Sequence, residues 1–152
     1  MAFNVAEFRA NLVGDGARPN LFQVTMTFPT FSTEATTSAQ ALTFLCKSAQ
    51  LPGSTLGTVP LFYFGRELKF AGNRNFADWT ITIINDENFK VRKAFESWMN
   101  GINSHSTNVR NGAAGSPTNY SVDARVNQYD KGGNVIKTYN FVGAFQIGRA
   151  HV

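Results

Sequence analysis

The side chains that could carry out chemistry in this sequence are few and far apart. Neither histidine, His105 or His151, has a second metal ligand at a recognisable spacing. Cys46, the one cysteine, lacks a histidine context that would activate it as a nucleophile, and we expect a buried, inert thiol. Asp86 and Glu87 form a carboxylate pair, but they stand where a helix is expected to begin, a position that the helix dipole favours for acids.

Two glycines near the N-terminus do not form a nucleotide-binding motif either. No strand pattern precedes Gly14 and Gly16, and Pro19 stands where a third glycine would be required. The sequence also lacks a Gly-x-Ser-x-Gly or phosphate-loop motif. The sequence therefore predicts no catalytic, cofactor or metal site, and we expect that this protein is not an enzyme.

The composition suits one β-rich domain. The chain has 152 residues, of which 43% are apolar and 14 are phenylalanine, enough for a core. The net charge is only +4 and the basic residues are not clustered, so the sequence does not indicate a dedicated nucleic-acid binder. No apolar run approaches the length needed to cross a bilayer, and we expect no membrane insertion.

Alternating and helical patterns predict the elements that form the core. Strands are predicted over 21–28 and 75–84, and a further strand over 41–47 follows a surface loop at 29–39. A helix is predicted from a cap at Asn85 or Asp86 to Gly101, with one apolar stripe. The expected core residues are Phe22, Val24, Met26, Trp79, Ile81, Phe95 and Trp98.

A second group of elements offers exposed surfaces. The stretch 55–64 and its return at 67–70 predict a long hairpin with consecutive aromatic residues on both faces, which is hard to bury in one small domain. One face of it is expected to meet another subunit, and the alternative is a hairpin tucked over its own core. The candidate interface residues are Val59, Leu61, Phe62, Tyr63, Phe64 and Arg66.

The C-terminal half predicts a strand pair over 120–129 and 135–145, joined by a glycine-rich turn. Segment 3–13 reads as a weak helix or arm, and 103–118 reads as a surface loop. Together these patterns predict a mainly β fold, an antiparallel sandwich or barrel with one flanking α-helix.

Three stretches carry a resemblance to a known family. They are Arg-Pro-Asn-Leu-Phe-Gln-Val at 18–24, Ala71–Trp79, and the Asn-Asp-Glu triplet at 85–87. In this order and spacing the chain resembles the tail-tube proteins of contractile-tailed bacteriophages of the T-even type. The resemblance spans Ala17 to about Phe145.

The resemblance implies a structural role in a virion tail, with assembly in the host cytoplasm. Six copies would form a ring, and rings would stack into a hollow tube inside a sheath. The tube would end at a baseplate, enclose a tape-measure protein and later conduct DNA. Extracellular injection and type VI secretion machines share this architecture, so a tube protein of such a machine is an alternative.

A lumen that passes DNA should be polar without excess positive charge, because each cationic contact with phosphate adds affinity. The outward set of the 120–129 strand suits this in part, since Arg125 needs an acidic neighbour to offset it. The candidate lumen residues are Ser121, Asp123, Arg125 and Asn127.

A second alternative function is that of a monomeric β-sandwich that binds ligand on an aromatic platform at 62–64. A small hydrolase is disfavoured by the missing catalytic groups.

The ends of the chain differ from the central segment. We assign 1–16 to an N-terminal arm and 17–146 to the tail-tube domain. The hexapeptide 147–152 matches one reading frame of a sequencing adapter, and we expect it to be foreign to the protein. On this interpretation roughly 20–40 residues of C-terminal strands and loop are missing, leaving an exposed sheet edge.

Overall fold

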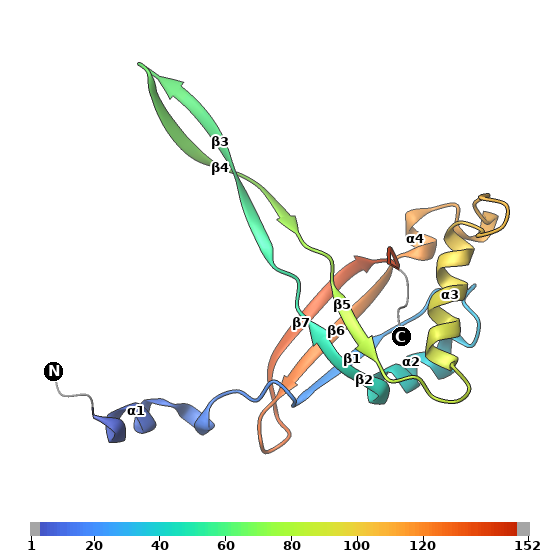
Figure 1. Cartoon of the computed structure of the whole chain (residues 1–152), viewed down its shortest axis with the longest axis horizontal. Coiled ribbons are helices and arrows are strands. Elements are labelled where there is room, and N and C mark those ends of the chain that lie inside the picture. Colours follow the sequence, from blue (N-terminus) through green and yellow to red (C-terminus); the bar gives the residue numbers. More distant parts are fainter. Residues whose placement is uncertain (1–3, 149–152) are drawn as a thin grey trace. The chain divides into compact units, whose positions relative to one another are not determined.

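The computed structural model describes residues 4–148 and divides into two compact units (Figure 1). The larger unit comprises Met1–Cys46 together with Ile83–Val152, and the smaller comprises Lys47–Thr82. We call the smaller unit the arm. Of the expected foreign tail at 147–152, residues 149–152 lie outside the described residues.

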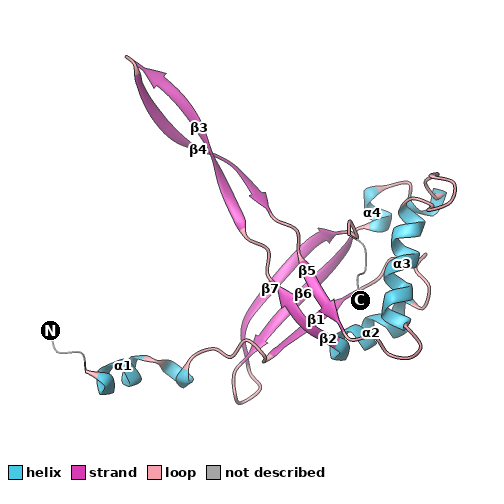
Figure 2. Ribbon diagram, viewed as in Figure 1, coloured by secondary structure: helices cyan, strands magenta, loops and turns pink. Residues whose placement is uncertain are grey.

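The larger unit is built on a three-stranded antiparallel sheet of order β1–β6–β7 (Figure 2). Its helix α2 packs against β1 and against α3. The elements are α1 (Val5–Asn11), β1 (Phe22–Met26), α2 (Ala35–Leu45), α3 (Lys90–Ile102), α4 (Pro117–Tyr120), β6 (Val122–Tyr129) and β7 (Val135–Ala144), with 3₁₀ turns at Val13–Asp15 and Gly112–Ala114.

The register of the sheet separates an apolar face from a polar one. Val24 lies opposite Val126, and Met26 lies opposite Ala124, so these four side chains share one face and all are buried. The intervening residues, with side-chain period two, point to the other face. The sheet therefore has one face toward the core and one face that carries polar groups.

Aromatic packing joins α3 to the core. The ring of Phe28 meets Phe95 and Trp98 edge-on, at centroid distances of 5.0 and 5.9 Å. Trp98 is 1% exposed, and its indole N–H donates to the carbonyl of Tyr120 at 2.9 Å. A buried indole needs such a partner, and this bond ties α3 to α4.

The arm consists of two antiparallel ribbons. In the first, β2 (Cys46–Gln50) pairs with β5 (Thr80–Ile83), and in the second, β3 (Ser54–Tyr63) pairs with β4 (Arg66–Phe76). Figure 1 shows β3 and β4 as a long twisted ribbon. Every residue of β3 is exposed, because a two-stranded ribbon has no third layer to cover either face.

The mainly β class with antiparallel sheets is confirmed, but several sequence-based expectations are corrected. Residues expected to form a loop and then a strand at 41–47 instead form α2, and the strand begins only at Cys46. Helix α3 begins at Lys90, four residues after the expected cap. The carboxylate of Asp86 still accepts a hydrogen bond from the Lys90 N–H at 3.1 Å.

Four of the seven expected core residues are buried, and the other three are half-buried. Val24, Met26, Phe95 and Trp98 are buried. Phe22 is only half-buried, at the beginning of β1, and Trp79 and Ile81 are half-buried in the arm. The alternating pattern located these side chains on strand faces, but it does not tell which face another layer covers. Among residues 4–148, no helix is long and apolar enough to span a membrane.

Candidate assembly surfaces

The tip of the arm, Thr58–Ala71, has two chemically different faces. Residues directly opposite one another in an antiparallel pair lie on the same face. Val59 is opposite Phe70 and Leu61 is opposite Leu68, which makes a continuous apolar set that Tyr63 extends toward the turn. We call this set, Val59, Leu61, Tyr63, Leu68 and Phe70, the apolar tip face. Its side chains are between 47% and 64% exposed.

The opposite face of the tip is mixed in character. Pro60 lies opposite Lys69, and Phe62 lies opposite Glu67. Aromatic residues were expected on both faces of the hairpin. Within the tip, the mixed face carries Phe62, whereas Tyr63 and Phe70 lie on the apolar tip face. Of the candidate interface residues, Val59, Leu61, Tyr63 and Arg66 share one side, Phe62 lies on the other, and Phe64 stands in the turn.

The turn at the tip is unusual for its residue type. Phe64 has a φ of 46° and Gly65 a φ of 74°, and two consecutive positive φ values are the signature of a type I′ hairpin turn. Glycine adopts this region freely, whereas phenylalanine does so at a cost. The ring of Phe64 is 87% exposed and meets Tyr63 edge-on at 4.5 Å. A strained, exposed aromatic residue at a tip is a candidate contact point.

A bulge interrupts the arm between its base and its tip. The pairing steps from Leu56 opposite Arg74 to Thr58 opposite Ala71, so β4 carries one residue more than β3 at this point. Glycines lie on both strands here. A Cβ on Gly72 would stand 3.1 Å from the carbonyl oxygen of Gly57, closer than side chains normally approach a backbone. The two strands can thus approach closely only because both residues lack a side chain.

The polar face of the larger unit's sheet forms a second surface. Arg125 donates from Nε to Asn140 Oδ1 at 3.0 Å, and Thr138 donates to Asn127 Oδ1 at 3.0 Å. Asp123 accepts from the N–H of Gly143 at 3.0 Å. The register adds two residues of β1, since Gln23 lies opposite Asn127 and Thr25 lies opposite Arg125. The charges of Asp123 and Arg125 balance, and the rest of this set is neutral.

The candidate lumen residues are brought together in part. Asp123, Arg125 and Asn127 share the polar face of β6. Ser121 instead caps the end of α4, where its N–H donates to the carbonyl of Pro117 at 2.9 Å. Sequence reasoning missed the contributions of Gln23 and Thr25, although the alternation of the β1 segment placed both on the face opposite Val24.

Helix α1 and its C-cap residue, Leu12, carry a third surface that sequence reasoning did not single out. Val5, Phe8 and Leu12 recur at helical spacing and are between 41% and 71% exposed. None of the residues of α1 is buried. We call Val5, Phe8 and Leu12 the α1 stripe. The 3–13 pattern indicated a weak helix or arm here, and the apolar spacing was the signal that could have located the stripe.

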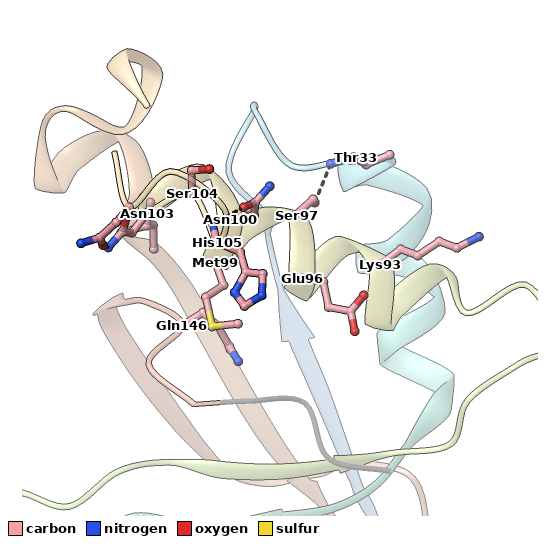
Figure 3. Close-up of a pocket in the computed structure, with 12 residues that line it drawn as sticks. Thr33, Lys93, Glu96, Ser97, Met99, Asn100, Asn103, Ser104, His105 and Gln146 are labelled. Atoms are coloured by element: carbon pink, nitrogen blue, oxygen red, sulfur yellow. Dashed lines mark hydrogen bonds between the residues drawn. The ribbon is translucent and has the colours of Figure 1, made fainter. Parts of the chain in front are cut away.

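A polar groove beside α3 does not have the features of an active site (Figure 3). The hydroxyl of Ser97 donates to the carbonyl of Ala94 and accepts from the N–H of Thr33, both at 3.0 Å, so it is engaged in structure. The N–H of His105 donates to Asn100 Oδ1 at 2.9 Å. The lining residues are Thr33, Lys93, Glu96, Ser97, Met99, Asn100, Ile102, Asn103, Ser104, His105, Asn108 and Gln146. Within the described part of the chain, no three His, Cys, Asp or Glu residues group to hold a metal ion.

Comparison with known proteins finds one matching family model and several similar phage proteins. The family model described as phage tail tube protein matches residues 17–150. The tail tube protein gp19 of Enterobacteria phage T4 is 35% identical over 121 residues, which cover 80% of this chain and 67% of the T4 protein. Its counterpart in Enterobacteria phage T6 shows the same identity and coverage. The tail tube protein of Serratia phage KSP90 is 32% identical over 143 residues, covering 93% of this chain and 78% of that protein.

Proposed function

Since this chain belongs to the phage tail tube protein family, we propose that six copies close into a ring and that rings stack into a hollow tube through which DNA passes. A tail tube protein is a structural component of the virion tail, and this relationship supports a non-enzymatic role. The sheath, baseplate and tape-measure proteins are the partners that such a tube would meet.

The observation that carries the proposal is the exposure of the apolar tip face. A two-stranded ribbon is marginally stable in water by itself, and this one leaves five apolar side chains about half exposed. Exposed apolar patches of this kind are typical of protein–protein contact sites. Contact with a neighbouring copy would remove them from water, in line with the candidate role of Val59, Leu61 and Tyr63 between subunits or rings.

The polar sheet face supports the lumen assignment. Asp123 offsets the positive charge of Arg125, and the hydrogen-bonded neutral side chains around them offer no cluster of cations to hold phosphate. A duplex could therefore slide past without being retained. In the proposed ring, the edge strands β1 and β7 would pair with strands of neighbouring copies, and closure would leave no edge free to aggregate.

Negative-stain electron microscopy of the purified chain tests the proposal. We expect hollow six-fold rings or stacked tubes. A monomer that stays dispersed at high concentration, even with sheath or baseplate proteins added, would contradict the proposal and favour a monomeric binding module. If tubes form, but the particles that contain them hold no DNA and deliver another cargo, the protein would instead belong to a phage-derived injection machine.

A further inference from the structure

The chain contains two Asn-Gly pairs, Asn100–Gly101 and Asn111–Gly112. An asparagine that precedes glycine is open to attack by the backbone on its own side chain. Glycine has no Cβ to hinder the approach, and its backbone is freer than that of any other residue. Both asparagines are exposed, so access to water does not distinguish the two pairs. The backbone around each pair does distinguish them.

The reaction open to such a pair is loss of the side-chain amide. The backbone nitrogen of the glycine attacks Cγ of the asparagine, the Cγ–Nδ2 bond breaks, and the backbone proton leaves with the amide nitrogen as ammonia. Water then opens the resulting succinimide ring at either carbonyl carbon, to give aspartate or isoaspartate. The net change converts an amide and water into a carboxylic acid and ammonia. The attack requires a backbone that can bring the glycine nitrogen against the side chain.

The Asn100–Gly101 pair is held within α3. This helix continues to Ile102, and in an α-helix the N–H of residue 101 is bonded to the carbonyl four residues before it. Gly101 is buried, and Oδ1 of Asn100 accepts a hydrogen bond from the N–H of His105 at 2.9 Å. The reaction here requires that this end of the helix opens first. Such open states make up about 0.1–10% of the population, which slows the reaction at least about tenfold.

The Asn111–Gly112 pair stands at the beginning of the 3₁₀ turn Gly112–Ala114. The N–H of Ala114 donates to the carbonyl of Asn111, and the N–H of Gly115 donates to the carbonyl of Gly112. Neither bond of the turn uses the N–H of Gly112, as expected for the first residue of a helical turn. Gly112 is exposed, and a Cβ on it would meet nothing within 4 Å. The glycine nitrogen therefore has room to approach the Asn111 side chain.

We propose that Asn111 is a site of spontaneous deamidation and that the folded chain confines this reaction to the Asn111–Gly112 pair. The reaction goes beyond the proposed tube function and needs no partner, because its only co-reactant is water. Each converted copy gains one negative charge on the loop that follows α3. The isoaspartate product also lengthens the main chain by one carbon, directly before a turn whose Ala114 is fully buried.

Timed incubation of the purified full chain at mildly alkaline pH, followed by peptide mapping, tests the proposal. Trypsin cleaves after Lys93, Arg110 and Arg125, which puts the two pairs in separate peptides, 94–110 and 111–125. Mass spectrometry then measures aspartate and isoaspartate at each pair. In the folded chain we expect conversion at Asn111 to be at least about tenfold faster than at Asn100. In urea, where the helix no longer holds Asn100, the two rates should be comparable.

Gly112→Ala is the matched variant, because the φ of Gly112 lies outside the left-handed region and its surroundings leave space for a Cβ. It should keep the melting temperature of the unmodified chain and slow conversion at Asn111 several-fold. Equal rates at the two pairs in the folded chain would overturn the proposal. So would an Asn111 that stays intact in the folded chain while both pairs react in urea, or an unchanged rate in Gly112→Ala. Since assembly does not enter the measurement, each of these results leaves the tube function standing.

Discussion

The ring of Phe31 lies directly over Gly101 of α3, so closely that a Cβ on residue 101 would collide with the edge of the ring. Gly101 is buried in the last turn of the helix, where glycine is otherwise unfavourable. The residue is therefore required for space rather than for backbone conformation. This contact joins the segment before α2 to the end of α3.

Gly101→Ala should destabilise the larger unit by about 1 kcal/mol. Displacing the Phe31 ring costs about 1–3 kcal/mol as overpacking, and alanine recovers up to about 1 kcal/mol through its helix propensity. Thermal unfolding followed by circular dichroism measures the difference. Gly53→Ala is the matched control, because a Cβ there meets nothing within 4 Å. A stabilised Gly101→Ala variant would show that the ring moves without cost.

Phe64→Asn should strengthen the arm and weaken assembly. Asparagine tolerates the positive φ that Phe64 adopts, so relief of strain should stabilise the hairpin by about 1 kcal/mol. Slower amide exchange at Tyr63 and Arg66 would report this gain. Loss of the exposed ring should raise the concentration at which tubes form. Phe64→Ala removes the ring without relieving the strain, and assembly unaffected in both variants would show that the ring is not a contact.

Thr25→Lys should make the tube retain DNA. Thr25 lies opposite Arg125 on the polar sheet face, and a lysine there would add uncompensated positive charge to each copy. Co-sedimentation of tubes with duplex DNA should rise at low salt and fall steeply as salt is added. Thr107→Lys, in the loop after α3, is the control of equal charge. Equal DNA retention by both variants would contradict the lumen assignment.

The turn between β6 and β7 predicts a dependence of stability on acid. The backbone N–H of Asn134 donates to the carboxylate of Asp130 at 2.8 Å, its side chain adds a second bond, and together they lower the pKa of Asp130. A carboxylate whose folded-state pKa is lowered contributes stability above its unfolded pKa of about 4. That contribution is lost as the pH falls through the lower folded-state pKa.

Asp130→Asn should accordingly melt at a lower temperature than the unmodified chain near pH 6. The difference between the two should close as the pH falls below the lowered folded-state pKa of Asp130, because the carboxylate is then protonated in both states. Melting temperatures measured across this pH range provide the test. Parallel curves for the two proteins would show that Asp130 contributes nothing through its charge. The carboxyl group is exposed, so the effect should be small.

Strong periodicity is what made parts of the fold predictable. The stripe of Val91, Phe95 and Trp98 predicted α3, and the alternation through Val24 and Met26 predicted β1, because each pattern reports one buried face. The turn residues at 131–134 and the alternation on both sides of them likewise predicted the β6–β7 pair.

Helix α2 could not be predicted in the same way. Its sequence is rich in threonine and small residues, which have modest helix propensity, and its buried residues are only Ser38 and Leu42. The apolar run that ends at Cys46 resembles a strand, and short apolar runs do not distinguish the two states. Packing against β1 and α3 stabilises the helical form of this segment. Such tertiary contacts cannot be predicted from the local sequence pattern.

The candidate surfaces were partly predictable for a related reason. The hairpin at 55–70 was recognised from its aromatic content, but the division of its faces depends on pairing Val59 with Phe70 and Leu61 with Leu68. Trp79 and Ile81 were predicted in the core because a strand pattern does not tell which of its faces another layer covers.

The bulge at Gly57 and Gly72 helps to fix the length of the β3–β4 ribbon. The turn at Phe64 and Gly65 sets the pairing of the tip, Ser54 opposite Phe76 sets the pairing of the base, and the extra residue of β4 absorbs the mismatch between them. With both ends held in register the ribbon cannot slip, so its reach is constant at about 30 Å from Ser54 to Tyr63. A change in the length of the ribbon that keeps this pairing must add or remove one residue on each strand. We therefore expect the arms of homologues to differ in length by whole residue pairs.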